Sequence, residues 1–485
     1  MKKIIPHFIL LLTLSFQISA QIISDPQVVA LQDPWGNARP RIALNADGNP
    51  VVIWTNVDTQ NIYCSVKSGG DFSTPLQLNP DGVLSAAMDW QGPDIASSGN
   101  HIAVVFKQTP EMEGHIYLVR SEDGGMSWGD TIRVATTGTI MLRFPALAMD
   151  NEGNPYVLLM QLYDMGASGS EWAVVRSEDE GQTFLPAVSA SNLSGVYVCD
   201  CCPGVITVNG DDVAVVYRNN DENVRDMRAT ISTNGAQTFS ITADMDDVDW
   251  MINACPSSGP SAYIANEILH STWMSQGTGD SRVYYSSYNI GTGDMVQSVE
   301  ISPALSSVVQ NHPSIAGNES SAAVVWQESQ SAQTNIRFAY SASPGIFLAD
   351  DIENLTSNQD GNQLRPHMVY SNGVYHIVYT DNGSNAVQYL TVSGFVRIEE
   401  NSFENNFSIF PNPASDVLNM QFNSTHGIRQ IEITDEAGRV CLSKSVSSNE
   451  NNLSLDLSSL AKGNYTVRTS MNGKIVSSQS FIKQH

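Results

Sequence analysis

The chain has 485 residues, which is more than one ordinary domain needs, so the sequence predicts at least two domains. It carries 24 Lys and Arg against 50 Asp and Glu, a formal net charge of -26. An acidic surface repels phosphate backbones, so nucleic acid is excluded as an expected partner. The excess of Asp and Glu is best explained by solubility. The alternative explanation is that acidic loops bind calcium.

The first 20 residues have the pattern of a secretory signal peptide. A basic Lys2-Lys3 start precedes an apolar run from Phe8 to Phe16, and Ser19-Ala20 offers small residues for cleavage. A membrane anchor is the alternative, but the run is shorter than the ~20 apolar residues that a span needs. No other stretch is long and apolar enough, so we expect an exported mature chain that starts at Gln21 and has no transmembrane segment.

A unit with a period of roughly 53 residues repeats between residues 21 and 395. Each unit opens at a proline and contains three apolar runs, and all units but the seventh add a weaker fourth; Gly, Asn and Asp separate the runs. The prolines are Pro40, Pro93, Pro145, Pro203, Pro256, Pro313 and Pro366. Short β-rich runs at this period are typical of the four-stranded blades of a propeller. The sequence therefore predicts an all-β propeller of seven blades, with six blades and one stray unit as the alternative.

The seventh unit has only three strands and ends at Ser393, whereas an orphan strand, Gln27 to Leu31, precedes the first unit. This orphan resembles the fourth strand of the other units. We expect it to pair with Val387 to Val392 and complete the seventh blade. Ring closure of this kind hides the free edges at which sheets aggregate.

The turn after the third strand of two units carries a conserved spacing of Ser, Asp, Gly and an aromatic residue. Ser121-Glu-Asp-Gly-Gly-Met-Ser-Trp128 and Ser177-Glu-Asp-Glu-Gly-Gln-Thr-Phe184 match the Asp-box, and Ser232 to Phe239 is a degenerate copy. Asp bonds neighbouring amides, Gly supplies a positive φ and the aromatic packs into the blade. We expect a structural role for the named positions, which are Ser121, Asp123, Gly125, Trp128, Ser177, Asp179, Gly181 and Phe184.

The composition changes near Asn401, and alternating apolar residues from Phe407 to the end predict a small β-sandwich. The domains are expected at 1–20 (signal peptide), 21–395 (propeller), 396–406 (linker) and 407–485 (sandwich). The tail contains four distinctive segments, which are Pro411-Asn412-Pro413, Asp435 to Val440, Leu460 to Tyr465 and Lys483. Through these residues it resembles the C-terminal sorting domain of type IX secretion cargo in the Bacteroidota. The resemblance implies recognition by the secretion machinery and delivery to the medium or the outer-membrane surface.

The first strand of each blade lines the channel of a propeller, so residues just before the repeated prolines are expected to form a ring at one mouth. These residues are Arg39, Gly92, Phe144, Cys202, Cys255, His312 and Arg365. Cations and cysteines would then gather on one rim of an acidic protein. Arg39 and Arg365 would be neighbours once the ring closes.

Four of the six cysteines lie between residues 199 and 255, which indicates a local site. Disulfides between blades are expected in an exported protein. Adjacent Cys201 and Cys202 would be strained as a pair, so Cys255 is expected to bond one of them and Cys199 the other. A copper or zinc site of thiolates with His312 is the first alternative, and unpaired buried thiols are the second.

The propeller as a whole resembles bacterial Asp-box proteins labelled sialidase-like. This resemblance implies hydrolysis of terminal sialic acids or related acidic glycans, and fold alone does not establish it. Such chemistry uses an arginine cluster, because a guanidinium grips a carboxylate bidentately. It also uses a Tyr-Glu nucleophile pair and an Asp acid/base.

The resemblance assigns candidate positions for this chemistry. Arg39 resembles the first arginine of the family, and Arg365, Arg218 or Arg225 would complete a triad. Asp58 is the candidate acid, and Glu267 the candidate partner of a tyrosine. The alternatives are arginines that only hold loops by ion pairs, a non-catalytic surface propeller that binds glycan or protein, and a metal-binding propeller that uses the cysteines.

Overall fold

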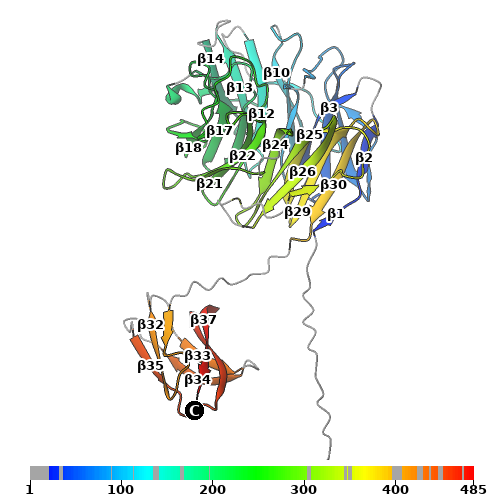
Figure 1. Ribbon diagram of the computed structural model, residues 1–485. Helices are drawn as coiled ribbons and strands as arrows, with labels where there is room; N and C mark the ends of the chain where they lie inside the picture. The colour runs from blue at the N-terminus through cyan, green and yellow to red at the C-terminus, as the bar shows by residue number, and fades with distance from the viewer. Residues whose placement is uncertain are drawn as a thin grey trace, which may run out of the picture. The chain divides into compact units, whose positions relative to one another are not determined.

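The computed structural model divides into two units, Met1–Val396 and Arg397–His485 (Figure 1). The described residues are 21–395 and 407–484, with internal gaps at 32–35, 89, 113, 135–140, 164–168, 196, 303–306, 343–346, 348–351, 423–429, 436–438, 446–451 and 472–473. The expected signal peptide (1–20) and linker (396–406) lie outside the described residues. No described helix combines the length and apolar character needed to cross a membrane.

The described residues of the first unit form seven antiparallel sheets, which we number as blades 1 to 7. Blade 1 contains β3 (Asn37–Leu44), β4 (Pro50–Asn56), β5 (Ile62–Ser68), β6 (Asp71–Phe72) and β7 (Leu76–Gln77). Blade 2 contains β8 (Asp94–Ser98), β9 (His101–Lys107), β10 (Ile116–Ser121) and β11 (Ile132–Arg133). Blade 3 contains β12 (Met141–Met149), β13 (Pro155–Leu162), β14 (Ser170–Arg176) and β15 (Val188–Ser189). A 3₁₀ turn, η2 (Asn192–Ser194), follows blade 3.

Blades 4 to 7 follow the same order along the chain. Blade 4 contains β16 (Val205–Asn209), β17 (Asp212–Arg218), β18 (Met227–Ser232) and β19 (Ile241–Asp244), and blade 5 contains β20 (Ser261–Ala265), β21 (Ile268–Ser275), β22 (Arg282–Asn289) and β23 (Asp294–Glu300). Blade 6 contains β24 (Val309–Gly317), β25 (Ala322–Gln330), β26 (Gln333–Ser341) and β27 (Ile352–Asn354). Blade 7 contains β28 (Gln363–Ser371), β29 (Val374–Asp381) and β30 (Ala386–Ser393) together with β1 (Ile22–Ile23) and β2 (Gln27–Leu31).

The first strands of the blades contact one another in a closed succession. Strands β3, β8, β12, β16, β20, β24 and β28 touch in this order, and β28 touches β3 again. This is the neighbour pattern of a propeller with its first strands around the centre. The expected all-β propeller class is therefore confirmed, and we take each sheet as one blade.

A buried aromatic side chain near the end of the second strand packs most blades together. Trp54, Phe106, Trp273, Trp326, Tyr217 and Tyr379 are all 2% exposed or less. These are the aromatic ends of the second apolar runs in the sequence. Rings of this size remove much apolar surface from water where two sheets face each other, which is the main stabilising term of the ring.

The repeated prolines produce a β-bulge in four first strands. The pairing of β3, β12, β24 and β28 shifts at Arg39-Pro40, Phe144-Pro145, His312-Pro313 and Arg365-Pro366. Proline has no amide hydrogen to donate, so the ladder is interrupted there. The preceding residue adopts φ between 47° and 57° in all four cases, a conformation that a non-glycine residue adopts only at a cost. The bulges aim these four side chains differently from their strand neighbours.

The orphan strand completes the seventh blade, as predicted. Strand β2 pairs with β30 from Gln27↔Tyr389 to Leu31↔Ala386, and β1 adds Ile22↔Ser393. Figure 1 shows β1 and β2 in blue beside β30. The N-terminal segment thus covers the outer edge of the last blade.

We expect deletion of residues 21–31 to lower the melting temperature and cause aggregation. The deletion removes the buried side chains of Val29 and Ala30 and exposes the hydrogen-bonding edge of β30. The lost burial corresponds to a fall in Tm of about 5 °C or more. Calorimetry and light scattering measure both effects. The matched control is Leu31→Ser, since that side chain is 75% exposed; an unchanged Tm in the deleted protein would contradict the closing role.

The second unit is a small β-sandwich, as predicted. One sheet has β31 (Phe407–Phe410), β32 (Val417–Phe422) and β35 (Asn452–Asp456), and the other has β33 (Gln430–Asp435), β34 (Val440–Ser445), β36 (Gly463–Met471) and β37 (Lys474–Lys483). Side chains of both sheets share one core. The motif residues at the two ends of the tail meet: Lys483 Nζ, almost fully buried, lies 2.9 Å from Asp416 Oδ1, and the Ile482 amide donates to Asn412 Oδ1.

Candidate functional site: the central cavity and the cysteine cluster

A cavity of about 130 Å³ lies where the first strands converge. Each of the seven blades contributes wall residues, among them Arg39, Gln91, Phe144, Gly204, Ser261, His312 and Arg365. The four bulged positions all lie on this wall. The interruption of pairing by proline therefore shapes the cavity.

Three arginines from two neighbouring blades line the cavity. Arg39 and Arg41 come from β3 and Arg365 from β28. Arg39 runs along Gly92, where an added Cβ would lie 3.3 Å from its Cδ. Arg365 NH1 lies 3.2 Å from His312 Nδ1. In a chain of net charge -26, this side of the cavity concentrates positive charge.

Asp94 is the one carboxylate among the described wall residues, and its oxygens are engaged. Its Oδ1 lies 3.7 Å from Arg41 Nε, and its Oδ2 accepts a hydrogen bond of 2.9 Å from the Leu147 amide. Burial lowers the pKa of Arg41, and the charge of Asp94 raises it again. Asp94 thus orients Arg41 and ties blade 2 to blade 3.

Two histidines on the cavity wall are held neutral. Burial, together with Arg365, Arg39 and Arg41, places the pKa of His312 well below 6.5, and burial with Arg41 and Arg39 does the same for His367. The Ile42 amide donates to His367 Nδ1 at 3.2 Å, which leaves the proton of the neutral ring on Nε2. The positive charge of the cavity therefore comes from the arginines.

Hydrogen bonds between neighbouring first strands repeat around the wall. The backbone amides of Ile42, Leu147, Ile315 and Met368 donate to side chains of His367, Asp94, Ser261 and Ser314, one strand away in each case. In every case the amide lies two residues after a repeat proline. This network fixes the strands at the cavity and so pre-organises the side chains that line it.

The register predicted from the prolines holds in blades 1, 2, 3, 6 and 7, where Arg39, Gly92, Phe144, His312 and Arg365 line the cavity. It is wrong in blades 4 and 5. There the wall is formed by Pro203, Gly204 and Val205 and by Ser257, Gly259, Pro260 and Ser261. Strand β16 begins only at Val205 and strand β20 only at Ser261, so Cys202 and Cys255 lie in the loops before these strands and are not among the wall residues.

The arginines expected to complete the triad lie elsewhere. Arg218, 1% exposed, donates to the carbonyls of Arg225 and Met274 and stacks over Trp250 at 5.0 Å. Arg225 points at the cysteines. Neither lines the central cavity. The third arginine there is Arg41 instead.

The two candidate catalytic carboxylates are not brought together with the arginines. Asp58 is exposed in the turn after β4 and lies outside the cavity wall. Glu267 occupies the β20–β21 turn, at the opposite end of β20 from the cavity, where burial and then the charge of Glu267 raise the pKa of Asp212. The described wall residues include no tyrosine.

Sequence reasoning missed Arg41, Asp94 and His367 at the cavity. The signal was present, because each follows a repeat proline directly. Alternate residues of a strand point to the same side, so the pattern Arg39-Pro-Arg41 and Arg365-Pro-His367 predicts two side chains per strand on the channel. The β-bulge at the proline also affects which side chains face the channel, and its position cannot be located from residue spacing alone.

The two full Asp-box copies share one set of hydrogen bonds. The Gly125 amide donates to Ser121 Oγ at 2.9 Å, and the Ser127 amide and hydroxyl donate to Asp123 at 2.8 and 2.6 Å. Ser177, Asp179, Gly181 and Thr183 repeat these contacts, which lower the pKa of Asp179 to about 2. Trp128 and Phe184 pack against adjoining hydrophobic cores. None of these residues lies on the described cavity wall, so their contacts support the expected structural role.

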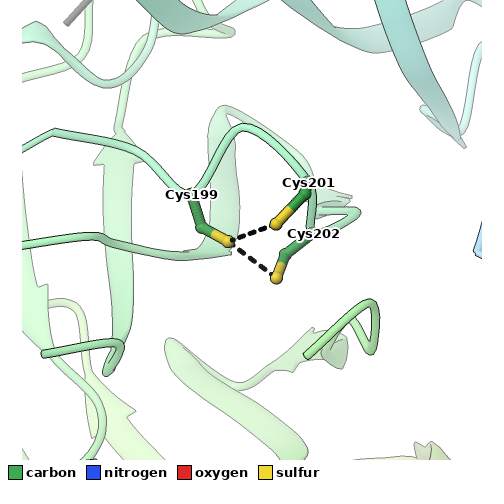
Figure 2. A group of neighbouring side chains, drawn as sticks. All are labelled: Cys199, Cys201 and Cys202. Atoms are coloured by element: carbon green, nitrogen blue, oxygen red, sulfur yellow. Dashed lines mark hydrogen bonds between the residues drawn. The ribbon is translucent and has the colours of Figure 1, made fainter. Parts of the chain in front are cut away.

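The four clustered cysteines lie in the loops before β16 and β20. Cys201 and Cys255 form a disulfide with a Cα–Cα distance of 5.9 Å, which joins blades 4 and 5. Cys199 Sγ lies 2.8 Å from Cys202 Sγ and 3.5 Å from Cys201 Sγ (Figure 2). The sequence left open whether Cys255 bonds Cys201 or Cys202. The structure shows Cys255 bonded to Cys201, with Cys199 next to Cys202.

The predicted metal set with His312 is not assembled. Among the described residues, the metal-ligating atoms that lie within 4.8 Å of one another in this cluster are those of Cys199, Cys201 and Cys202. His312 is on the central cavity with Arg365. One of the three sulfurs is also consumed by the disulfide.

Comparison with known proteins supports this architecture. Residues 408–484 match the family described as secretion system C-terminal sorting domain. No curated protein matches the sequence. An ulvan lyase, a polysaccharide lyase bound to -[GlcA(1-4)Rha3S]-, has a TM-score of 0.50 at 11% identity and covers 77% of this chain and 96% of its own.

Two further solved structures show weaker likeness. An α-L-arabinanase from Penicillium chrysogenum has a TM-score of 0.45 at 13% identity, over 77% of this chain and 98% of its own. A mutant sialidase from Trypanosoma rangeli has a TM-score of 0.43 at 12% identity, over 95% and 88%.

The protein is therefore a β-propeller with a fold similar to that of the ulvan lyase, and it carries a small β-sandwich as its second unit. Its tail belongs to the type IX secretion sorting domains, and this directs the protein to the medium or the outer-membrane surface.

Proposed function

We propose that the central cavity of the propeller binds the carboxylate of an acidic sugar, so that the exported protein recognises acidic glycans outside the cell. The observation that carries this proposal is the convergence of Arg39, Arg41 and Arg365 on one cavity of a strongly acidic protein. An arginine cluster in a partly dry pocket matches a carboxylate in charge and in planar shape.

The electrostatics of the wall favour an anion over a cation. Asp94 is paired with Arg41 and with a backbone amide, so it adds little negative charge to the opening. The histidines stay neutral beside the arginines and supply ring N–H groups without a second charge. The ligand of the ulvan lyase contains a glucuronic acid, which is an example of an acidic glycan on a propeller of this fold.

Of the two candidate functions, the residues of the cavity wall support binding of the sugar without hydrolysis better than they support hydrolysis. Sialidase chemistry requires a nucleophilic tyrosine and its carboxylate partner beside the arginines. The described wall has no tyrosine, and Asp58 and Glu267 lie away from it. Hydrolysis of sialosides is the second candidate, favoured by the presence of Asp94 and the exposed Trp90 at the same cavity.

Calorimetry with N-acetylneuraminic acid and glucuronic acid tests binding, and a fluorogenic sialoside tests hydrolysis. We expect saturable binding of an acidic sugar and none of its neutral counterpart, glucose for glucuronic acid. Turnover of the sialoside that Asp94→Asn abolishes would establish the second candidate. Absence of binding to both acids would contradict the proposal.

We expect the affinity for the acidic sugar to be nearly constant between about pH 5 and 8. The arginines remain charged over this range. His312 and His367 have pKa values well below 6.5 when folded, so they take up no proton until the pH is lower still. If they titrated normally, acidification would add positive charge and strengthen binding. A tenfold gain in affinity between pH 7 and pH 5 would therefore contradict the neutral state of the histidines.

A further inference from the structure

Cys199 lies within reach of two different sulfurs. Its Sγ is 2.8 Å from Cys202 Sγ and 3.5 Å from Cys201 Sγ, and Cys201 is already bonded to Cys255 (Figure 2). Exchange between thiols and disulfides proceeds by attack of a thiolate on a bonded sulfur. The cluster therefore contains an attacking group (Cys199), a target sulfur (Cys201) and a leaving group (Cys255).

Arg225 stabilises the thiolate form of Cys199. Its NH1 lies 2.9 Å from Cys199 Sγ and 3.8 Å from Cys201 Sγ, and its own Nε is held by the carbonyl of Ile252. Arg218 fixes Arg225 further by donating to its carbonyl oxygen. A guanidinium in this place favours an anionic sulfur and opposes a bound metal cation.

The two neighbouring thiols differ in character. The hydrogen bond with Cys202, with a backbone bond at Cys201 and the charges of Arg225 and Arg218, lowers the pKa of Cys199 to about 7. Burial and the adjacent Cys199 raise the pKa of Cys202. Cys199-Asp-Cys-Cys202 also has the Cys-x-x-Cys spacing, and the Cys202 amide donates to the Cys199 carbonyl to form the turn. One reactive and one resolving thiol at this spacing are typical of redox dithiols.

We propose that the cluster is a thiol–disulfide exchange site, in which the Cys199/Cys202 dithiol exchanges with the Cys201–Cys255 disulfide. The Cys199 thiolate attacks the Cys201 sulfur, a Cys199–Cys201 bond forms, and Cys255 leaves as a thiolate that takes a proton from solvent. Cys202 then loses its proton, attacks the Cys199 sulfur and releases Cys201, which is protonated. One disulfide and two thiols are present before and after, so no external oxidant is consumed.

Exchange links the interior of the propeller to its surface. Cys199 and Cys202 are 0% and 1% exposed, whereas Cys255 is exposed to solvent. Low-molecular-weight thiols and disulfides outside the cell therefore reach the cluster at Cys255. Because Cys201–Cys255 joins the loops of blades 4 and 5, each exchange opens or closes the covalent link between them.

The exchange is tested by trapping its first step in the full-length protein. Cys202→Ser removes the resolving thiol, so the reaction stops with Cys199 bonded to Cys201 and Cys255 free. We expect iodoacetamide, added under native conditions, to label Cys255 completely, and peptide mass spectrometry to find the Cys199–Cys201 link. The matched control is Cys199→Ser/Cys202→Ser, in which Cys255 should stay unlabelled. An intact Cys201–Cys255 bridge in Cys202→Ser overturns the proposal.

A second measurement uses the wild-type chain, so that a folding defect of the variant does not decide the outcome. After full reduction and reoxidation with one equivalent of a low-molecular-weight disulfide, we expect both single bridges, Cys199–Cys202 and Cys201–Cys255, in slow interchange. One bridge alone that never exchanges, or thiols protected by bound zinc or copper, overturns the proposal.

The pH profile separates an exchange site from a structural staple. The rate of Cys255 release in the wild-type chain, measured by labelling of Cys255, should rise up to about pH 7 and then level off, whereas an unperturbed thiol continues to gain reactivity to about pH 8.5. Arg225→Gln should shift this plateau to higher pH and slow release at pH 7 by about fivefold or more. A profile that Arg225→Gln leaves unchanged contradicts the role of the guanidinium.

Discussion

Removal of residues 401–485 is expected to leave a folded propeller inside the periplasm. The two units are compact by themselves, and the tail has its own core of side chains from both of its sheets. The tail also matches the sorting domain on which the secretion machinery acts. Loss of the tail should therefore abolish surface delivery while the melting temperature of the propeller stays the same. Cell fractionation with protease protection measures delivery, and calorimetry measures folding.

The matched control is a gain of function. A reporter that carries residues 1–20 at its start and residues 397–485 at its end should appear at the surface or in the medium. Lys483→Ala tests a single residue of the tail, because it removes the nearly buried Nζ that pairs with Asp416. We expect this substitution to reduce surface delivery. Normal surface delivery of the truncated propeller would contradict the assigned role of the tail.

Substitution of the cavity arginines is expected to have the second large effect. Arg39→Ala and Arg365→Ala should each weaken binding of the acidic sugar by roughly 10- to 100-fold, since a hydrogen bond to a charged group contributes about 1.5–3 kcal/mol. Arg41→Ala also leaves Asp94 without its ion pair and adds repulsion to the loss. Calorimetric titration of the same sugar measures all three.

Two further variants show whether the loss is local. Arg120→Ala removes an arginine paired with Glu122 at the Asp-box end of blade 2, so affinity should be unchanged. Gly92→Ala keeps every charge but places a methyl group 3.3 Å from Arg39 Cδ, so it should displace that arginine and weaken binding. Equal affinity in wild type, Arg39→Ala and Arg365→Ala would contradict the anion site.

The architecture could be predicted from the sequence because it repeats. The prolines recur in every unit, and the aromatic ends of the second runs and the Gly-containing turns recur in most of them, so the same local pattern indicates a blade several times over. The closing strand Gln27–Leu31 was found by the same count and pairs with β30 as expected. The tail was found by its motif residues, two of which, Asn412 and Lys483, turn out to join its two ends.

The composition of the candidate site could be predicted only in part. Arg39, His312 and Arg365 were placed at the cavity by their position before a proline. Blades 4 and 5 broke the rule, because β16 begins only at Val205 and β20 only at Ser261, so Cys202 and Cys255 lie in the loops before these strands. Glu267 was a candidate only through the family resemblance, which gives no position in the fold. The structure places it in the β20–β21 turn, outside the cavity wall.

The most direct test of the proposed recognition is a calorimetric comparison of one acidic sugar with its methyl ester on the full-length protein. The ester keeps the ring and its hydroxyl groups but removes the negative charge that the three arginines would bind. We predict measurable binding of the acid at pH 7 and a loss of about 100-fold or more for the ester. Equal affinity for acid and ester would show that the carboxylate is not the recognised group and would contradict the central claim.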